Sequence, residues 1–180
     1  MSMKILIADD HSLFREALTH YVTRVDPDAE VFIASDIHGA MERLQANQDL
    51  DIILLDLHMP GMNGLQGLEK IRAAYPPIPV ALMSGMAQKS DIEAALEKGA
   101  AGYFPKTMSG QAMMQGIRKL VDGGEYIARD HNTDELMPSY YNDGEDKNNG
   151  TTSKPRIVNV NDFRLTPREK EVLGYLCEVQ

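Results

Sequence analysis

Short apolar runs alternate with helix-like segments over the first two-thirds of this 180-residue chain. The runs are short and almost continuously apolar, which is typical of strands that are covered on both faces. Strands separated by helices favour a parallel sheet, and right-handed crossovers restrict the topology to a doubly wound α/β fold. The predicted strands are Lys4–Ala8, Glu30–Ala34, Asp51–Leu55, Val80–Met83 and Ala101–Phe104.

The segments between these strands have the spacing of amphipathic helices. In the first of them, apolar residues recur between Phe14 and Val25 at intervals of three and four. Ser90–Glu93 has the pattern of a capping box, which predicts the start of the fourth helix. Gly99 and Gly123 are predicted to end the fourth and fifth helices, because glycine readily adopts the left-handed conformation found there.

Carboxylates follow two strands that are neighbours in a doubly wound sheet. Asp9 and Asp10 come after the first strand, and Asp56 comes after the third. Ligands of such sheets bind outside the carboxyl ends of the strands. Like charges that converge there disfavour ionisation, and a divalent cation relieves this cost. Oxygen ligands suit Mg²⁺, and no set of His or Cys ligands competes for a softer metal, so we expect a Mg²⁺ site.

A hydroxyl and an ammonium group are predicted at the same rim of the sheet. Ser84 ends the fourth strand, and Lys106 lies just past the fifth. Beside carboxylates and Mg²⁺ these groups suit a phosphoryl group, with Lys106 as a point charge and Ser84 as a hydrogen-bond donor. The nucleophile would be a carboxylate, which gives an aspartyl phosphate.

The motifs at this rim resemble those of a response-regulator receiver domain. The resemblance covers about residues 3–124 in order and spacing, and it implies a flavodoxin-like sheet of five strands in the order 2-1-3-4-5. The motifs are Asp9-Asp10-His11, Asp56-Leu57-His58-Met59-Pro60-Gly61-Met62-Asn63-Gly64, Ser84-Gly85 and Gly102-Tyr103-Phe104-Pro105-Lys106.

This resemblance implies a phosphoacceptor and a set of metal ligands. Asp56 would accept the phosphoryl group, which Lys106 would contact. Asp9, Asp10 and Asp56 would hold Mg²⁺ together with the backbone carbonyl of His58. The side chain of His58 is expected to face the entrance of the site, or else to be an exposed loop histidine.

The resemblance also implies a conformational switch. Ser84 would turn toward the phosphoryl oxygens, and Tyr103 would fill the space that Ser84 leaves. We expect His11 to pack near the start of the first helix rather than to act as an acid or base. The sequence leaves open whether the Lys106–Thr107 bond is cis or trans.

The composition changes after residue 125, which divides the chain into three predicted parts. Residues 1–124 form the receiver domain, residues 125–163 a flexible acidic linker, and residues 164–180 the first helix of an incomplete domain. Leu165–Leu173 contains a capping box and resembles the first helix of a LuxR-type helix-turn-helix domain. This pairing is similar to the NarL/FixJ subfamily, and the chain is expected to stop before its DNA-binding surface begins.

The expected function is that of a response regulator in a two-component system. Asp56 would accept a phosphoryl group from a sensor histidine kinase in a Mg²⁺-dependent reaction, and phosphorylation would favour a homodimer. The intact protein, though not this shortened chain, would then bind DNA and control transcription. The chain is not expected to be a stand-alone enzyme. The alternative is a receiver without an output domain, which acts in a phosphorelay or as a protein-binding adaptor.

Two further classes of protein are disfavoured. Hydrolases of the haloacid-dehalogenase type use an aspartyl nucleophile and Mg²⁺, but their Asp-x-Asp-x-Thr motif is replaced here by His58 and Pro60 after Asp56. A flavodoxin-like electron carrier is disfavoured because carboxylates at the first strand-to-helix turn would repel a flavin phosphate.

Composition indicates in which compartment the protein is expected and which binding surfaces are disfavoured. The longest apolar runs, such as Ile52–Leu55, are far shorter than the roughly 20 residues of a membrane-spanning helix, and no signal peptide is evident. Cys177 is the only cysteine, which favours a reducing cytoplasm. The net charge of −9 argues against a large nucleic-acid surface in the residues present.

Overall fold

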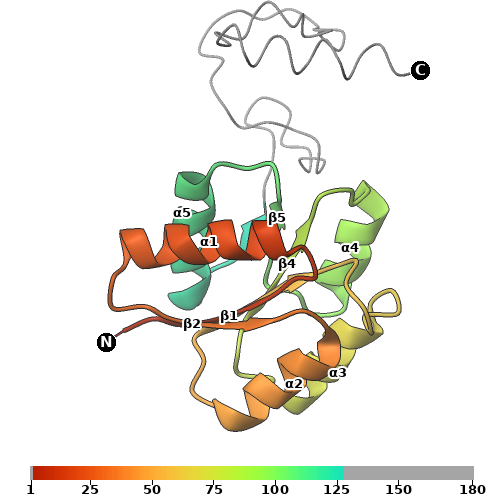
Figure 1. The fold of residues 1–180 in the computed structure, drawn as a ribbon. Helices are drawn as coiled ribbons and strands as arrows, with labels where there is room; N and C mark the ends of the chain where they lie inside the picture. Colours follow the sequence, from red (N-terminus) through yellow and green to blue (C-terminus); the bar gives the residue numbers. More distant parts are fainter. Residues whose placement is uncertain (1, 128–180) are drawn as a thin grey trace, which may run out of the picture. The chain divides into compact units, whose positions relative to one another are not determined.

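The computed structural model describes residues 2–127, which form a parallel sheet with helices on both faces (Figure 1). The strand order is β2-β1-β3-β4-β5-β6, so the predicted doubly wound fold and the order 2-1-3-4-5 are confirmed. The strands are β1 (Lys4–Ala8), β2 (Glu30–Ala34), β3 (Ile52–Asp56), β4 (Val80–Ser84), β5 (Gly102–Pro105) and β6 (Tyr126–Ile127). The helices are α1 (Ser12–Val25), α2 (Ile37–Ala46), α3 (Gln66–Ala74), α4 (Lys89–Glu97) and α5 (Gly110–Val121).

One strand of the sheet was not predicted. β6 pairs in parallel with β5, with Gly102 opposite Tyr126 and Tyr103 opposite Ile127. A strand of two residues is too short for a hydrophobic period to reveal it, so the five-stranded prediction is one strand short. Because β6 lies within residues 125–163, the prediction of a flexible linker is wrong at its first residues; the rest of that segment and the helix of residues 164–180 lie outside the described residues.

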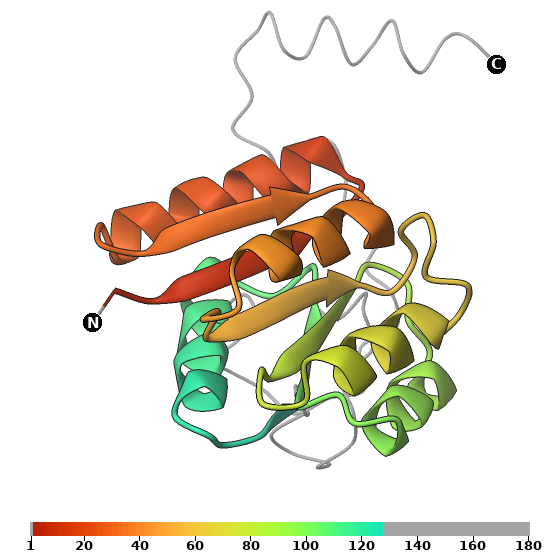
Figure 2. The ribbon, with the colours of Figure 1, turned by 90° about the horizontal axis from the view of Figure 1, so that it is seen from below.

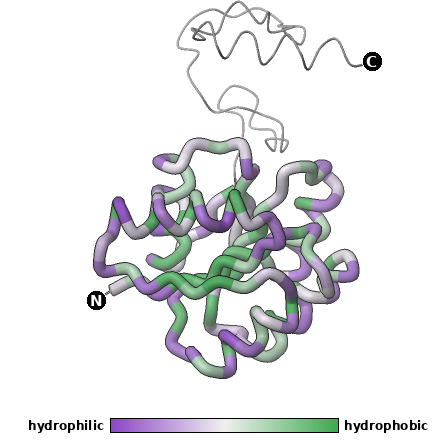
Figure 3. Tube along the Cα trace, in the orientation of Figure 1, coloured by the Kyte–Doolittle hydropathy of each residue, from purple (hydrophilic) through white to green (hydrophobic). Residues whose placement is uncertain are grey.

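The two faces of the sheet carry separate apolar cores. Successive side chains of a strand point to opposite faces, so Ile53 and Leu55 of β3 pack on the side of α2, α3 and α4. Ile52 and Leu54 pack on the side of α1 and α5. Figure 1 shows α1 and α5 on one side of the sheet and α2 and α3 on the other, Figure 2 shows the strands side by side, and Figure 3 shows the apolar residues gathered along the strands. The sheet is therefore buried between two apolar cores.

Both ends of α4 can be compared with the sequence pattern. The N-cap is Gln88, whose backbone N–H donates to Asp91 Oδ2 at 3.0 Å, so the predicted capping box at Ser90–Glu93 is wrong. The helix begins at Lys89, which places Ser90 inside the first turn. The predicted end is confirmed, because Gly99 has a φ of +94° and its N–H donates to the carbonyl of Leu96.

Among residues 2–127, none of the helices combines the length and the apolar character needed to cross a membrane.

Candidate functional site

The carboxyl ends of β1 and β3 bring two buried carboxylates together. Ala8 of β1 lies opposite Leu55 of β3, so the residues that follow them, Asp9 and Asp56, are neighbours at the rim. Both are buried, with exposed fractions of 0% and 1%. Asp10 lies beside them and is exposed to solvent. The topology therefore produces the predicted cluster of three carboxylates.

Lys106 supplies a positive charge inside this cluster. Its Nζ lies 2.7 Å from Asp9 Oδ2 and 3.3 Å from Asp56 Oδ2, and its side chain is only 11% exposed. The backbone N–H of Lys106 donates to the carbonyl of Ser84 at 2.9 Å, which ties the start of the β5–α5 loop to the end of β4. The predicted lysine is thus in direct contact with two of the predicted carboxylates.

The surroundings of Asp56 disfavour its ionised form. Burial raises the pKa of the Asp56 carboxyl, and the negative charge of Asp9 raises it further. Lys106 and the backbone N–H of His58, which donates to Asp56 Oδ1 at 3.3 Å, act in the opposite direction. The net direction is upward, so one lysine does not fully compensate the buried negative charge.

The donor set fits a divalent cation. Three ionised carboxylates and one ammonium group leave a local charge of −2, which a doubly charged cation would neutralise. Carboxylate oxygens are the ligands that Mg²⁺ takes in proteins. One ligand atom from each of Asp9, Asp10, His11 and Asp56 lies within 4.8 Å of the others, which is compact enough for a single ion.

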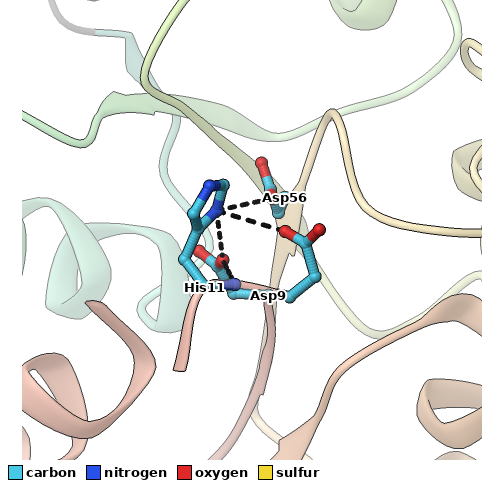
Figure 4. Close-up of side chains that lie close together, drawn as sticks. Asp9, His11 and Asp56 are labelled. Carbon is cyan, nitrogen blue, oxygen red and sulfur yellow. Dashed lines mark hydrogen bonds and ion pairs between the residues drawn. The ribbon is translucent and has the colours of Figure 1, made fainter. Parts of the chain in front are cut away.

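His11 is a member of this cluster that the sequence interpretation did not include. It lies at the start of α1, where it is the N-cap, but its ring lies over the carboxylates and does not pack against the helix as expected (Figure 4). Its Nδ1 is 3.2 Å from Asp9 Oδ1, 3.1 Å from Asp10 Oδ1 and 3.8 Å from Asp56 Oδ2. The signal was its position directly after the two aspartates.

Ser84 and Tyr103 lie on the adjacent strands β4 and β5. Ser84 is fully buried, and its Oγ accepts a hydrogen bond from the backbone N–H of Met86 at 3.1 Å. Tyr103 is also buried, and its hydroxyl has no hydrogen-bond partner among the described residues. Burial raises the pKa of Tyr103 to about 12, so this phenol stays neutral at physiological pH.

Two further features of the loops can be compared with the sequence interpretation. The side chain of His58 is exposed and lines a hollow of about 320 Å³ with Asp91 and Ala94 of α4. Residues 2–127 contain no cis peptide bond, so the Lys106–Thr107 bond is trans.

Comparison with known proteins gives consistent matches over this part of the chain. The family model described as the response regulator receiver domain matches residues 5–118. The glycerol metabolism activator of Pseudomonas putida is 41% identical over 127 residues, which cover 71% of this chain and 58% of that protein. The nitrate/nitrite response regulator protein NarL of Escherichia coli K12 is 32% identical over 174 residues, which cover 97% of this chain and 74% of NarL.

A solved structure of a receiver domain also matches this chain. The signal receiver domain of a NarL response regulator from Mycobacterium tuberculosis matches with a TM-score of 0.62 and 29% identity, covering 68% of this chain and 98% of that one. The chain spans less than two thirds of the Pseudomonas relative, at 58% of its length.

Proposed function

The chain belongs to the response regulator receiver domain family, and from this premise we propose that Asp56 accepts a phosphoryl group from a sensor histidine kinase. The observation that carries the proposal is the Asp56 carboxylate, buried at a strand end beside Asp9 and 3.3 Å from the ammonium group of Lys106. A buried carboxylate with uncompensated charge and an adjacent cation is suited to phosphoryl transfer, which depends mainly on position and charge neutralisation.

The chain's own groups divide the work of the transfer. An Asp56 oxygen attacks the phosphorus atom, the bond from phosphorus to the donor breaks, and the donor leaves with the electron pair. Lys106 then neutralises phosphoryl oxygens as a point charge. Asp9, Asp10, Asp56 and the carbonyl of His58 would hold Mg²⁺, which supplies further positive charge to the same oxygens. The chain takes part in its own phosphorylation and dephosphorylation, and we do not propose a stand-alone enzyme.

Phosphorylation would be sensed through Ser84 and Tyr103. The phosphoryl group adds roughly −1.5 to −2 charges at neutral pH. The Ser84 hydroxyl, which now accepts from the Met86 N–H, would instead donate to a phosphoryl oxygen. The phenol of Tyr103 would move into the space that Ser84 leaves. A switch from 1:99 to 99:1 requires about 5.5 kcal/mol of differential stabilisation.

The output that we propose is transcriptional. Relatives such as NarL are named as response regulators, and the resemblance of residues 165–173 to a LuxR-type helix fits the same class. In this proposal phosphorylation favours a homodimer of the cytoplasmic protein, and the intact effector domain binds DNA.

Phosphorylation by acetyl phosphate tests the proposal. With Mg²⁺ present, we expect intact-mass measurement to show one phosphoryl group on the wild-type chain and none on Asp56→Ala. Asp28→Ala, which removes an exposed carboxylate, is the matched control and should be labelled like the wild type. Chelation of divalent cations should abolish labelling. Stoichiometric labelling of Asp56→Ala would falsify the assignment.

A further inference from the structure

The imidazole of His11 lies among the groups that would hold the cation. Its Nδ1 is 3.1 to 3.8 Å from one oxygen each of Asp9, Asp10 and Asp56. Figure 4 shows the ring turned toward Asp9 and Asp56, although 67% of the side chain is exposed to solvent. None of the roles proposed above uses this ring.

Hydrogen bonds fix the backbone of His11 beside the carboxylates. The N–H of His11 donates to Asp9 Oδ1 at 2.8 Å, and its carbonyl accepts from the N–H of Arg15 at 3.0 Å in the first turn of α1. The side chain itself caps no helix N–H, so the helix start does not require the imidazole. Its approach to the carboxylates therefore needs an explanation other than helix capping.

The distances are those between two ligands of one ion. In an octahedral site with bonds of about 2.1 Å, neighbouring ligand atoms are about 3.0 Å apart and opposite ones about 4.2 Å apart. Separations of 3.1 and 3.2 Å also suit N–H···O hydrogen bonds, whereas the 3.8 Å between Nδ1 and Asp56 Oδ2 is too long for one. The observed separations of 3.1, 3.2 and 3.8 Å fall in the range between two ligands.

We propose that His11 Nδ1 is a ligand of the divalent cation and shifts the selectivity of the site toward metals that bind imidazole. The proposal deepens the cation site proposed above and rests on it. Mg²⁺ prefers oxygen ligands and keeps its waters, so it gains little from a nitrogen. Mn²⁺ and the later divalent metals accept imidazole more readily, so a site with three carboxylates and one imidazole discriminates in their favour.

Metal titration of His11→Ala tests this directly. We expect the dissociation constant for Mn²⁺ to rise about tenfold, as is typical when a metal site loses a supporting group, and that for Mg²⁺ to change less than about twofold. Pulsed electron paramagnetic resonance of the Mn²⁺ protein should show coupling to a ¹⁴N nucleus that disappears in the variant. His20→Ala removes an exposed imidazole of α1 that has no role in the proposed site, and it should keep both the selectivity and the nitrogen coupling.

The possible outcomes separate this proposal from the one on which it rests. If wild-type protein binds neither Mg²⁺ nor Mn²⁺, the cation site itself is wrong. If both bind but His11→Ala leaves their ratio and the nitrogen coupling unchanged, only the role of His11 is wrong. Tighter Mn²⁺ binding by His11→Ala would show that the ring competes with the cation, and this result would also overturn the proposal.

Discussion

Within the same strands, the apolar body and the polar carboxyl end have opposite effects on stability. β3 has four apolar residues followed by Asp56, and β4 has four followed by Ser84, with all ten positions buried. Among the described residues, the buried polar side chains are Asp9, Asp56 and Ser84, and all three lie at this rim. Burial of the apolar body stabilises the fold, whereas burial of a carboxylate costs free energy.

This difference explains how a small domain can keep an unfavourable charge cluster in one place. The central strands pack helices on both faces, so the strand ends are held by contacts that do not involve the cluster. Changes in the body should therefore alter stability without altering the chemistry. Changes at the rim should alter both, and their effect on stability should depend on cations.

The largest effect on stability is expected for Leu54→Ala in the body of β3. Leu54 is fully buried between β1 and β4, so its loss leaves a cavity and should lower the free energy of unfolding by about 3–5 kcal/mol. Urea denaturation followed by circular dichroism measures this. Below the unfolding transition, the variant should still accept one phosphoryl group per chain. A loss below 1 kcal/mol, or an intact fold that cannot be phosphorylated, would contradict the separation of body and rim.

A somewhat smaller effect is expected at the rim for Lys106→Met. The substitution leaves Asp9 and Asp56 buried without their ammonium partner, and in the presence of a chelator we expect a loss of about 2–4 kcal/mol. Mg²⁺ should restore part of this loss because it neutralises the same carboxylates. Lys70→Met, at an exposed position of α3, should change stability little and show no such Mg²⁺ dependence. An equal loss with and without Mg²⁺ would show that the charge of Lys106 is not what matters.

The sequence was sufficient to predict the sheet and the carboxylates at its rim. The runs that became β1 and β2 were predicted with the correct ends, because strands covered on both faces are continuously apolar. The meeting of Asp9 with Asp56 followed from the rule that parallel strands end at one edge. Both predictions follow from the hydrophobic pattern of the strands and from the topology of parallel sheets, which can be inferred from a single sequence.

Other features depend on local geometry that the hydrophobic period of the sequence does not encode. The ring of His11 could turn toward the helix or toward the carboxylates, and the choice depends on the three-dimensional positions of Asp9, Asp10 and Asp56. At α4, both Gln88 and Ser90 are followed by an acidic residue three positions later, and Gln88 became the N-cap. The strand β6 has only two residues, and it is defined by its pairing with β5 and not by a pattern in its own sequence.

The smallest effect, and one of opposite sign, is expected for Asp56→Asn. In a chelator at pH 7, replacing the ionised carboxylate by a neutral amide of similar shape should stabilise the fold by about 1 kcal/mol. The pKa of Asp56 is raised in the folded state above its ordinary value of 3.8. Its contribution to stability is therefore fully present below that value and is lost as the pH rises through the folded-state pKa.

The stability difference between Asp56→Asn and the wild type should accordingly be greatest at neutral pH and shrink as the pH falls toward 4. Thermal unfolding of both proteins across this pH range measures the difference, and Asp28→Asn at an exposed position serves as the control. If Asp56→Asn is less stable than the wild type at pH 7, the carboxylate stabilises the fold, and the contrast between body and rim does not hold at its central residue. If the variant is more stable, the residue proposed to accept the phosphoryl group is retained at a cost to the fold, which is the behaviour expected of a functional charge.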